Sequence, residues 1–136
     1  MDEGGNAIFF KGRSHPRFSV SLPIDYWHVD SVKRQTGRTG NISEKGTLIY
    51  VPEKMETGKN VRLKVFFSNP LEMNSIDVLG EVVWNNGYWR NEGGYQIGMK
   101  YVDISPEDTY TLKSFLNTLT PRITEELLFP YGMYIR

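Results

Sequence analysis

The stretch YQIGMKYVDISPEDTYTLKSFLNTL, residues 95–119, contains the change of periodicity that decides the fold. Its first part has the period-of-two pattern of a half-buried strand, with one face formed by Tyr95, Ile97, Met99 and Tyr101. The SPED sequence at 105–108 then has the composition of a helix start, with a serine cap, a proline and two acids near the positive end of the helix dipole. An apolar face follows at helical spacing, at Leu112, Phe115, Leu116 and Leu119. The stretch predicts a strand followed by a helix over 106–119, which Pro121 ends.

Alternating apolar residues predict further strands upstream of this stretch. One face runs through Phe18, Val20, Leu22, Ile24 and Tyr26, where Pro23 indicates an edge or bulged position because it lacks a ladder donor. Thr47–Val51 and Val61–Phe67 follow the same rule. In the next segment Gly80 marks a bulge or close contact, and one face is predicted to hold Ile76, Val78, Val82 and Trp84. About six short strands and one helix predict an all-β fold, a six-stranded antiparallel barrel with a C-terminal helix.

The length and composition indicate one soluble domain. The chain has 136 residues, 39% of them hydrophobic, and no cysteine. No apolar run approaches the roughly 20 residues that span a bilayer, and the N-terminus has no signal-peptide pattern, so we expect a cytoplasmic protein without membrane insertion. We divide the chain into a flexible, Gly-rich arm (1–10), the barrel with its helix (11–120) and an apolar tail (121–136) that either docks on the barrel or meets a partner.

Signals for catalysis or metal binding are weak. His15 and His28 are the two histidines, and no spacing typical of metal ligands accompanies them. No Gly-rich phosphate loop precedes a helix, and a nucleophile such as Ser43 has no histidine near it in sequence. We therefore expect a binding module rather than an enzyme, with no catalytic residues, no metal and no cofactor.

A basic cluster lies just before the first strand. Residues 11–40 hold six basic and two acidic residues, a local balance of +4 in a chain of zero net charge. Within this segment, Arg13 and Arg17 are four residues apart in the sequence RSHPR. Their planar guanidinium groups suit phosphate oxygens or the O6/N7 edge of guanine. The alternative is two exposed arginines on a linker.

A second cluster, NISEKG at 41–46, precedes the next strand. Asn41 and Ser43 alternate onto one side and offer the donors and acceptors that read a purine edge, while Ile42 turns to the core. Gly46 permits a positive φ or a close approach of the backbone to a ligand. The alternative is a tight turn that uses Asn, Ser and Gly for backbone reasons.

Together the two clusters resemble the PilZ domain, whose pattern is Arg-x-x-x-Arg followed by Asp/Asn-x-Ser-x-x-Gly. The order, the spacing and the strand pattern after the motifs agree with that family from Lys11 to about Leu119. The resemblance includes the GKNV sequence at 58–61, the VVW sequence at 82–84 and the GMKY sequence at 98–101.

The resemblance implies a barrel that binds the bacterial second messenger cyclic di-GMP. On that basis Arg13 and Arg17 are expected to bind phosphates and guanines. Asn41 and Ser43 are expected to form hydrogen bonds to a guanine, and Gly46 to leave room for that base. Lys11 and Trp84 are further ligand-binding candidates, although Trp84 is equally consistent with a core position at the barrel end. Many members have an arginine directly before the first motif, where this chain has Gly12, so the resemblance leaves open whether one or two ligands bind.

These observations favour a stand-alone cyclic di-GMP receptor that acts on a protein effector, not yet identified, by rearranging its N-terminal arm. One alternative is a small barrel that binds single-stranded RNA, which the lack of widespread positive charge disfavours, so that we expect no nucleic-acid polymer as partner. The other is a ligand-independent interaction domain that uses the apolar tail after Pro121.

Overall fold

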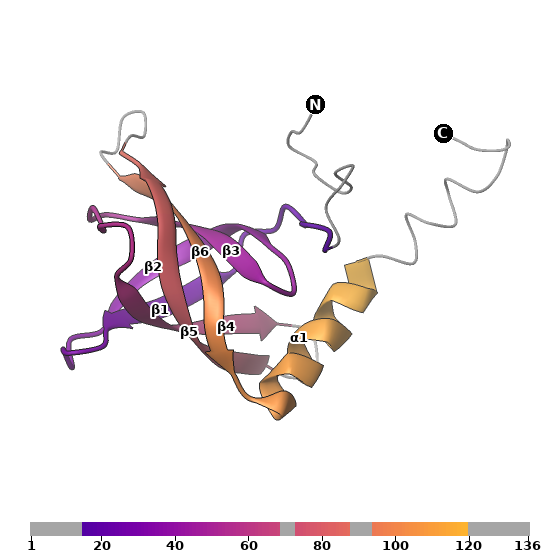
Figure 1. Cartoon of the computed structure of the whole chain (residues 1–136). Helices are drawn as coiled ribbons and strands as arrows, with labels where there is room; N and C mark the ends of the chain where they lie inside the picture. Colours follow the sequence, from indigo (N-terminus) through magenta and orange to yellow (C-terminus); the bar gives the residue numbers. More distant parts are fainter. Residues whose placement is uncertain (1–14, 69–72, 88–93, 120–136) are drawn as a thin grey trace, which may run out of the picture.

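The computed structural model describes residues 15–68, 73–87 and 94–119, and it contains six strands and one helix (Figure 1). The N-terminal half contributes β1 (Pro23–His28), β2 (Gln35–Ile42) and β3 (Gly46–Val51). The second half contributes β4 (Asn60–Ser68), β5 (Met73–Asn86), β6 (Tyr95–Ile104) and α1 (Pro106–Leu119). The predicted all-β fold with a C-terminal helix is confirmed. The predicted arm (1–10) and tail (121–136) lie outside the described residues.

The strands form a closed antiparallel barrel in the order β1-β2-β3-β6-β5-β4. Closure occurs where β1 pairs with β4, and Ile24 lies opposite Val65 in that ladder. The expectation that Pro23 marks an edge strand was wrong, because β1 has a neighbour on both sides. Pro23 is the first residue of β1, a position where its missing N–H costs the sheet little.

Alternate residues of every strand point into the barrel and form one hydrophobic core. Among the described residues, nine of these apolar side chains are fully buried at 0% exposure: Tyr26, Ile42, Ile49, Val61, Leu63, Val65, Ile76, Val82 and Ile97. Most belong to the apolar face that the alternating pattern predicts for each strand. Burial of this area is the main favourable contribution to folding.

Strand β2 was not predicted, because its sequence QTGRTGNI reads as a polar loop. Two glycines let β2 pair closely with β3. A Cβ atom at Gly37 would lie 2.7 Å from the Tyr50 carbonyl oxygen, and one at Gly40 would lie 2.5 Å from Cε2 of the Tyr50 ring. The pairing of β2 with β3 therefore requires glycine, which has no side chain, at these two positions. Hydrophobic periodicity does not detect such a requirement.

Strand β5 contains two irregularities in its pairing with β6, one just before Gly80 and one just after Val82. The register shifts between Leu79 and Gly80, as the glycine predicted, and again between Val82 and Trp84. The second bulge reverses the expected alternation, so Val82 is buried while Trp84 is 41% exposed. The prediction that Trp84 shares the inward face of β5 was therefore wrong, and a core role for it is excluded.

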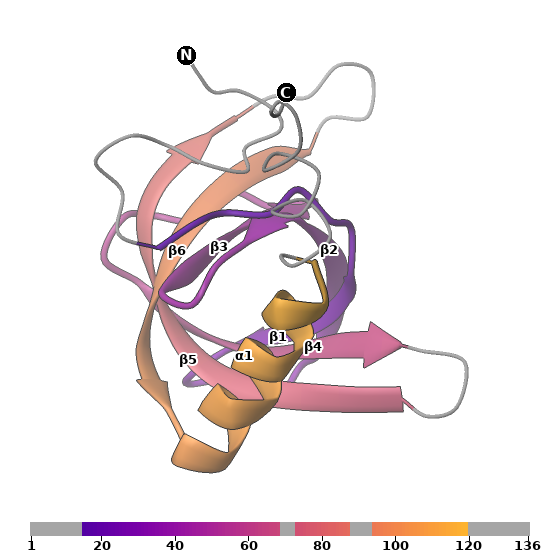
Figure 2. The same cartoon turned by 90° about the vertical axis from the view of Figure 1, so that its right-hand side faces the viewer.

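Helix α1 begins and packs as predicted. The Ser105 hydroxyl accepts a hydrogen bond from the Asp108 main-chain N–H at 3.0 Å, which is an N-cap. Leu112 and Leu116 are buried in the common core, and the helix lies across one end of the barrel (Figure 2). None of the helices within the described ranges has the length and apolar character required to cross a bilayer.

The segment before β1 is attached to β2 through the buried side chain of Thr39. Its hydroxyl donates to the Val20 carbonyl oxygen at 2.6 Å and accepts from the Leu22 N–H at 2.9 Å. The main-chain N–H of Thr39 also donates to the Leu22 carbonyl oxygen at 2.9 Å. One threonine thus satisfies polar groups on a neighbouring segment that the regular ladder leaves unpaired.

We expect Thr39→Val to lower the free energy of unfolding by about 1–3 kcal/mol, because it leaves the Leu22 N–H without its buried partner. Thr39→Ser keeps the hydroxyl and removes one methyl group, so it should cost only about 1 kcal/mol. Urea denaturation of both variants measures the difference. Equal losses for the two would show that the hydroxyl does not hold this segment.

Candidate ligand-binding site

The NISEKG motif forms the turn from β2 to β3, and Ser43 organises it. The Ser43 main-chain N–H donates to the Gly46 carbonyl oxygen at 2.9 Å. Its hydroxyl accepts from the N–H groups of Lys45 at 3.2 Å and Gly46 at 3.3 Å. Ser43 is 4% exposed, so its side chain serves the backbone of the turn. These contacts of Ser43 agree with the alternative in which the motif forms a tight turn and its serine bonds to the backbone.

Gly46 allows β3 to approach β6 closely. A Cβ atom at this position would lie 2.3 Å from the Met99 carbonyl oxygen, closer than any side chain tolerates. The positive φ that the sequence permitted occurs instead at Gly58, at 94°. The close contact with β6 is sufficient reason for glycine in the motif, without any requirement for ligand space.

Asn41 has an unsatisfied side chain at the end of β2. Its Oδ1 atom is buried and has no hydrogen-bond partner within the described part of the chain. Its main-chain carbonyl oxygen, by contrast, accepts a hydrogen bond from the Thr47 hydroxyl at 2.7 Å. A buried acceptor without a partner is unfavourable, so Oδ1 loses no hydrogen bond if the Asn41 side chain turns outward to meet a donor.

Arg17 is brought to this turn by main-chain pairing. Phe18 and Ile42 exchange two hydrogen bonds, of 2.9 Å and 3.0 Å, in an isolated antiparallel bridge. In that register the residue before Phe18 lies beside the residue after Ile42, so Arg17 is next to Ser43. The second arginine of the first motif and the second motif therefore meet in space, although more than twenty residues separate them in sequence.

Tyr101 of β6 supports the same turn and was not predicted as a site residue. Its hydroxyl donates to the Ser43 carbonyl oxygen at 3.2 Å, and its N–H donates to the Lys45 carbonyl oxygen at 2.9 Å. Burial raises the pKa of Tyr101 above its ordinary value, and the positive charge of Arg17 lowers it by less. The phenol therefore stays neutral beside Arg17. The alternating pattern identified Tyr101 only as part of a strand face.

A contact between His15 of the first motif and Glu44 of the second also joins the two motifs. His15 Nδ1 lies 3.8 Å from Glu44 Oε1, and both side chains are about one-third exposed, at 35% and 36%. Glu44 is thus an acid within an otherwise basic neighbourhood. Any anionic ligand bound here approaches this carboxylate as well as Arg17, and a protonated His15 reduces the repulsion.

Trp84 lies on the outer surface of the barrel, in the same cross-strand row as Asn41. Asn41 pairs with Leu48, Leu48 with Gly98, and Gly98 with Trp84. A Cβ atom at Gly98 would lie 2.3 Å from the Trp84 Nε1 atom, so the indole ring rests directly on the glycine. The row forms an apolar strip that leads from the NISEKG turn to an aromatic ring.

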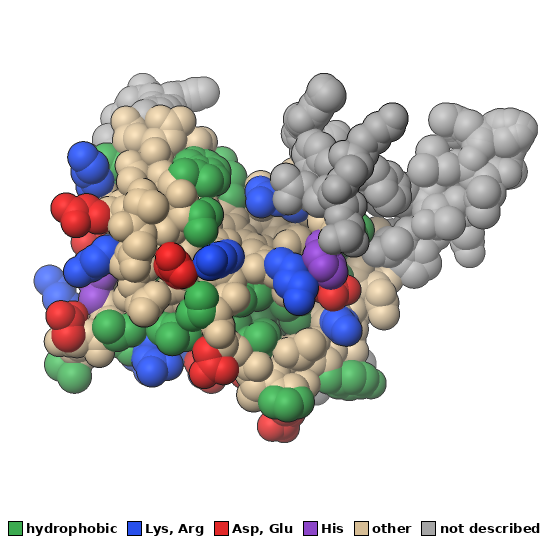
Figure 3. All heavy atoms as spheres, viewed as in Figure 1, with side chains coloured by type: hydrophobic (Ala, Val, Ile, Leu, Met, Phe, Trp, Pro, Cys, Tyr) green, Lys and Arg blue, Asp and Glu red, His purple; other side chains and the backbone are tan. Residues whose placement is uncertain are grey.

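The structure therefore gathers Arg17, Asn41, Ser43 and Gly46 at one turn, with Trp84 at the far end of the adjoining row. Lys11 and Arg13 lie outside the described residues. On the face shown in Figure 3, basic and acidic side chains are interspersed rather than separated. That face shows no continuous basic surface of the kind that tracks a nucleic-acid backbone.

Several solved structures share this fold at low sequence identity. The Bacillus subtilis inhibitor of motility MotI (DgrA) superposes with a TM-score of 0.69 at 15% identity, over 83% of this chain and 54% of that one. The chain thus spans about half the length of MotI. The PilZ domain of Escherichia coli YcgR with c-di-GMP gives 0.59 at 12% identity, over 85% and 96% of the two chains. The K. pneumoniae MrkH–c-di-GMP complex gives 0.62 at 14%, over 87% and 57%.

A comparison with curated proteins found no match. The family model described as the PilZ domain, however, matches residues 11–118, a range that includes both motifs, all six strands and nearly all of α1. This match covers well over half of the sequence, and the closed barrel with its C-terminal helix agrees with it. The chain belongs to the PilZ domain family.

Proposed function

We propose that this protein is a receptor for cyclic di-GMP that binds the dinucleotide at the β2–β3 turn. The observation that carries the proposal is the Phe18–Ile42 bridge, which fixes Arg17 beside the Asn41–Gly46 motif. Membership of the PilZ family supports it, as do two neighbours of the same fold whose structures contain c-di-GMP.

The contacts of each residue suggest its role. Arg17 supplies a fixed guanidinium for phosphate oxygens or the O6/N7 edge of a guanine, and Arg13 supplies a second from the preceding segment. The unpartnered Oδ1 of Asn41 accepts a hydrogen bond from the guanine amino group. Ser43 and Gly46 act mainly by shaping the turn, since their contacts are with the backbone. Tyr101 positions the turn from β6.

The row from Asn41 to Trp84 extends the site along the outer surface. A guanine held at Asn41 lies at one end of this row, and the exposed indole ring offers a stacking surface at the other. Lys11 is a further cation for the phosphates. The glycine directly before Arg13 removes one charge from the usual family pattern, which favours a single bound dinucleotide over a stacked pair.

The signal would pass through the segment before β1. Arg17 is held at the turn by main-chain hydrogen bonds, whereas Arg13 lies four residues earlier. A ligand that contacts both arginines and Asn41 ties that segment to the barrel. Ile8, Phe9 and Phe10 would move with it and present a changed apolar patch to a protein effector. The protein would work in the cytoplasm as an adaptor without catalytic activity.

Binding is tested by calorimetric titration of the purified protein with cyclic di-GMP. Arg17→Ala should weaken binding by about 1.5–3 kcal/mol, the value of a hydrogen bond to a charged group, or roughly one to two decades in the dissociation constant. Arg62→Ala removes an exposed arginine from β4 and serves as the matched control with unchanged affinity. A wild-type titration without saturation at high micromolar ligand would refute the proposal.

The ligand should survive binding, because the sequence has no catalytic motif and the described residues hold no cluster of His, Asp or Glu side chains that could bind a metal ion. Cyclic di-GMP incubated with excess protein, with or without magnesium, is expected to be recovered intact by chromatography. Linear dinucleotide that forms in proportion to protein, and disappears in a point variant, would contradict a purely adaptor role.

Amide hydrogen exchange tests the signalling route. Ligand should increase protection in residues 11–17 and in residues 41–46 together. Fixing the backbone of a residue costs roughly 1–2 kcal/mol, so any ordering of this segment by the ligand would reduce the affinity by that amount per residue. Protection confined to 41–46 would show that the N-terminal segment does not carry the signal.

A further inference from the structure

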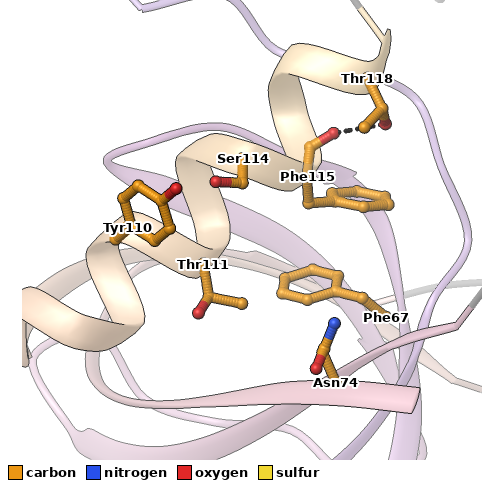
Figure 4. A pocket seen from close by; sticks show the side chains of 7 residues that line it. All are labelled: Phe67, Asn74, Tyr110, Thr111, Ser114, Phe115 and Thr118. Atoms are coloured by element: carbon orange, nitrogen blue, oxygen red, sulfur yellow. Dashed lines mark hydrogen bonds between the residues drawn. The ribbon is translucent and has the colours of Figure 1, made fainter. Parts of the chain in front are cut away.

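A concave site that shares no residue with the β2–β3 turn lies beside α1. It is a groove of about 440 Å³ between α1 and the β4–β5 hairpin (Figure 4). The aromatic rings of Phe67 and Phe115 stack on each other, with centroids 4.5 Å apart and planes 19° from parallel, and the stacked pair forms part of the lining. Ser114 and Tyr110 line it from the helix and Asn74 from β5.

The lining gives the groove an apolar interior and a polar rim. Within the described residues it contains no charged side chain, and its polar groups are the hydroxyls of α1 and the Asn74 amide. Tyr110 at the rim is 73% exposed, a large fraction for an aromatic side chain that the helix could have buried. Such a site suits an apolar segment with few polar groups rather than an anionic nucleotide.

The chain that follows α1 starts at this groove. The helix ends at Leu119, one residue after Thr118, which lines the groove. The subsequent sequence is rich in large apolar residues: Leu127, Leu128, Phe129, Tyr131, Met133, Tyr134 and Ile135. No role in the proposed ligand site uses this segment, and its composition disfavours exposure to water.

The length of that segment is sufficient for it to return along the helix. The groove runs from Tyr110 to Thr118, a distance of about 12 Å at 1.5 Å per helical residue. Phe129 is ten positions after Leu119, and extended chain covers at most about 36 Å over ten residues. Proline is unfavourable in a helix interior, so Pro121 disfavours continuation of α1 beyond this point.

We propose that the segment Leu127–Tyr131 of the same chain docks in the groove between α1 and β4–β5, with its apolar side chains against Phe67 and Phe115. Tethering favours this occupant over a second copy, because a short linker holds the segment at an effective concentration in the millimolar range. The uncharged interior fits the uncharged sequence LLFPY. The proposal goes beyond the cyclic di-GMP site and does not depend on it.

Cross-linking can test this directly because the sequence contains no cysteine. In the full chain, Ser114→Cys is combined with Phe129→Cys and treated with a short bismaleimide. The matched control combines Lys113→Cys with Phe129→Cys, since Lys113 is the neighbouring exposed residue of α1 and does not line the groove. We expect the Ser114 pair to cross-link within one chain about tenfold faster than the control pair.

Two results would overturn the proposal. Equal cross-linking rates for the two cysteine pairs would mean that the segment does not dock in the groove. Cross-links that form mainly between copies, seen as dimers that increase with protein concentration, would assign the groove to a second molecule. Amide hydrogen exchange gives a second measurement: removal of residues 122–136 should reduce protection of residues 110–118, and unchanged protection would count equally against docking.

Discussion

Barrel closure by the β1–β4 ladder is the constraint on which the rest of the structure depends. With β1 paired on both sides, no edge remains for regular pairing of the segment before it. That segment is held instead by the isolated Phe18–Ile42 bridge and by the Thr39 hydroxyl. Both attachments are to β2, so the segment must cross the barrel next to the β2–β3 turn. The position of Arg17 follows from this route.

Around the turn, several residues of the family motif make their observed contacts with the backbone. Ser43 closes the turn with its hydroxyl, and Gly46 lets β3 meet the Met99 carbonyl of β6. Tyr101 donates to the Ser43 carbonyl from the opposite strand. Asn41 differs from these because its Oδ1 remains buried and unpartnered within the described residues. The turn therefore combines a hydrogen-bonded frame with one unsatisfied acceptor and one cation held by main-chain pairing.

The two ends of the domain lie at different sites. The segment before β1 meets the β2–β3 turn, whereas the chain after α1 starts beside the Phe67–Phe115 groove. The core residues Leu112 and Leu116 hold α1 against the barrel. The proposed ligand site and the proposed docking site of the C-terminal segment thus lie on separate surfaces around one core.

The sequence by itself determined most of the strands, the start and end of α1 and the two motifs, because alternation, helical spacing and capping are local patterns. It did not identify β2, since the closeness of Gly37 and Gly40 to Tyr50 depends on a neighbouring strand. It placed Trp84 on the wrong face, because a bulge after Val82 is set by pairing with β6. It could not assign a role to Tyr101 for the same reason. Only the tertiary structure decided that Arg17 lies beside Ser43, because that contact requires a main-chain bridge between segments that are distant in sequence and closed into one barrel.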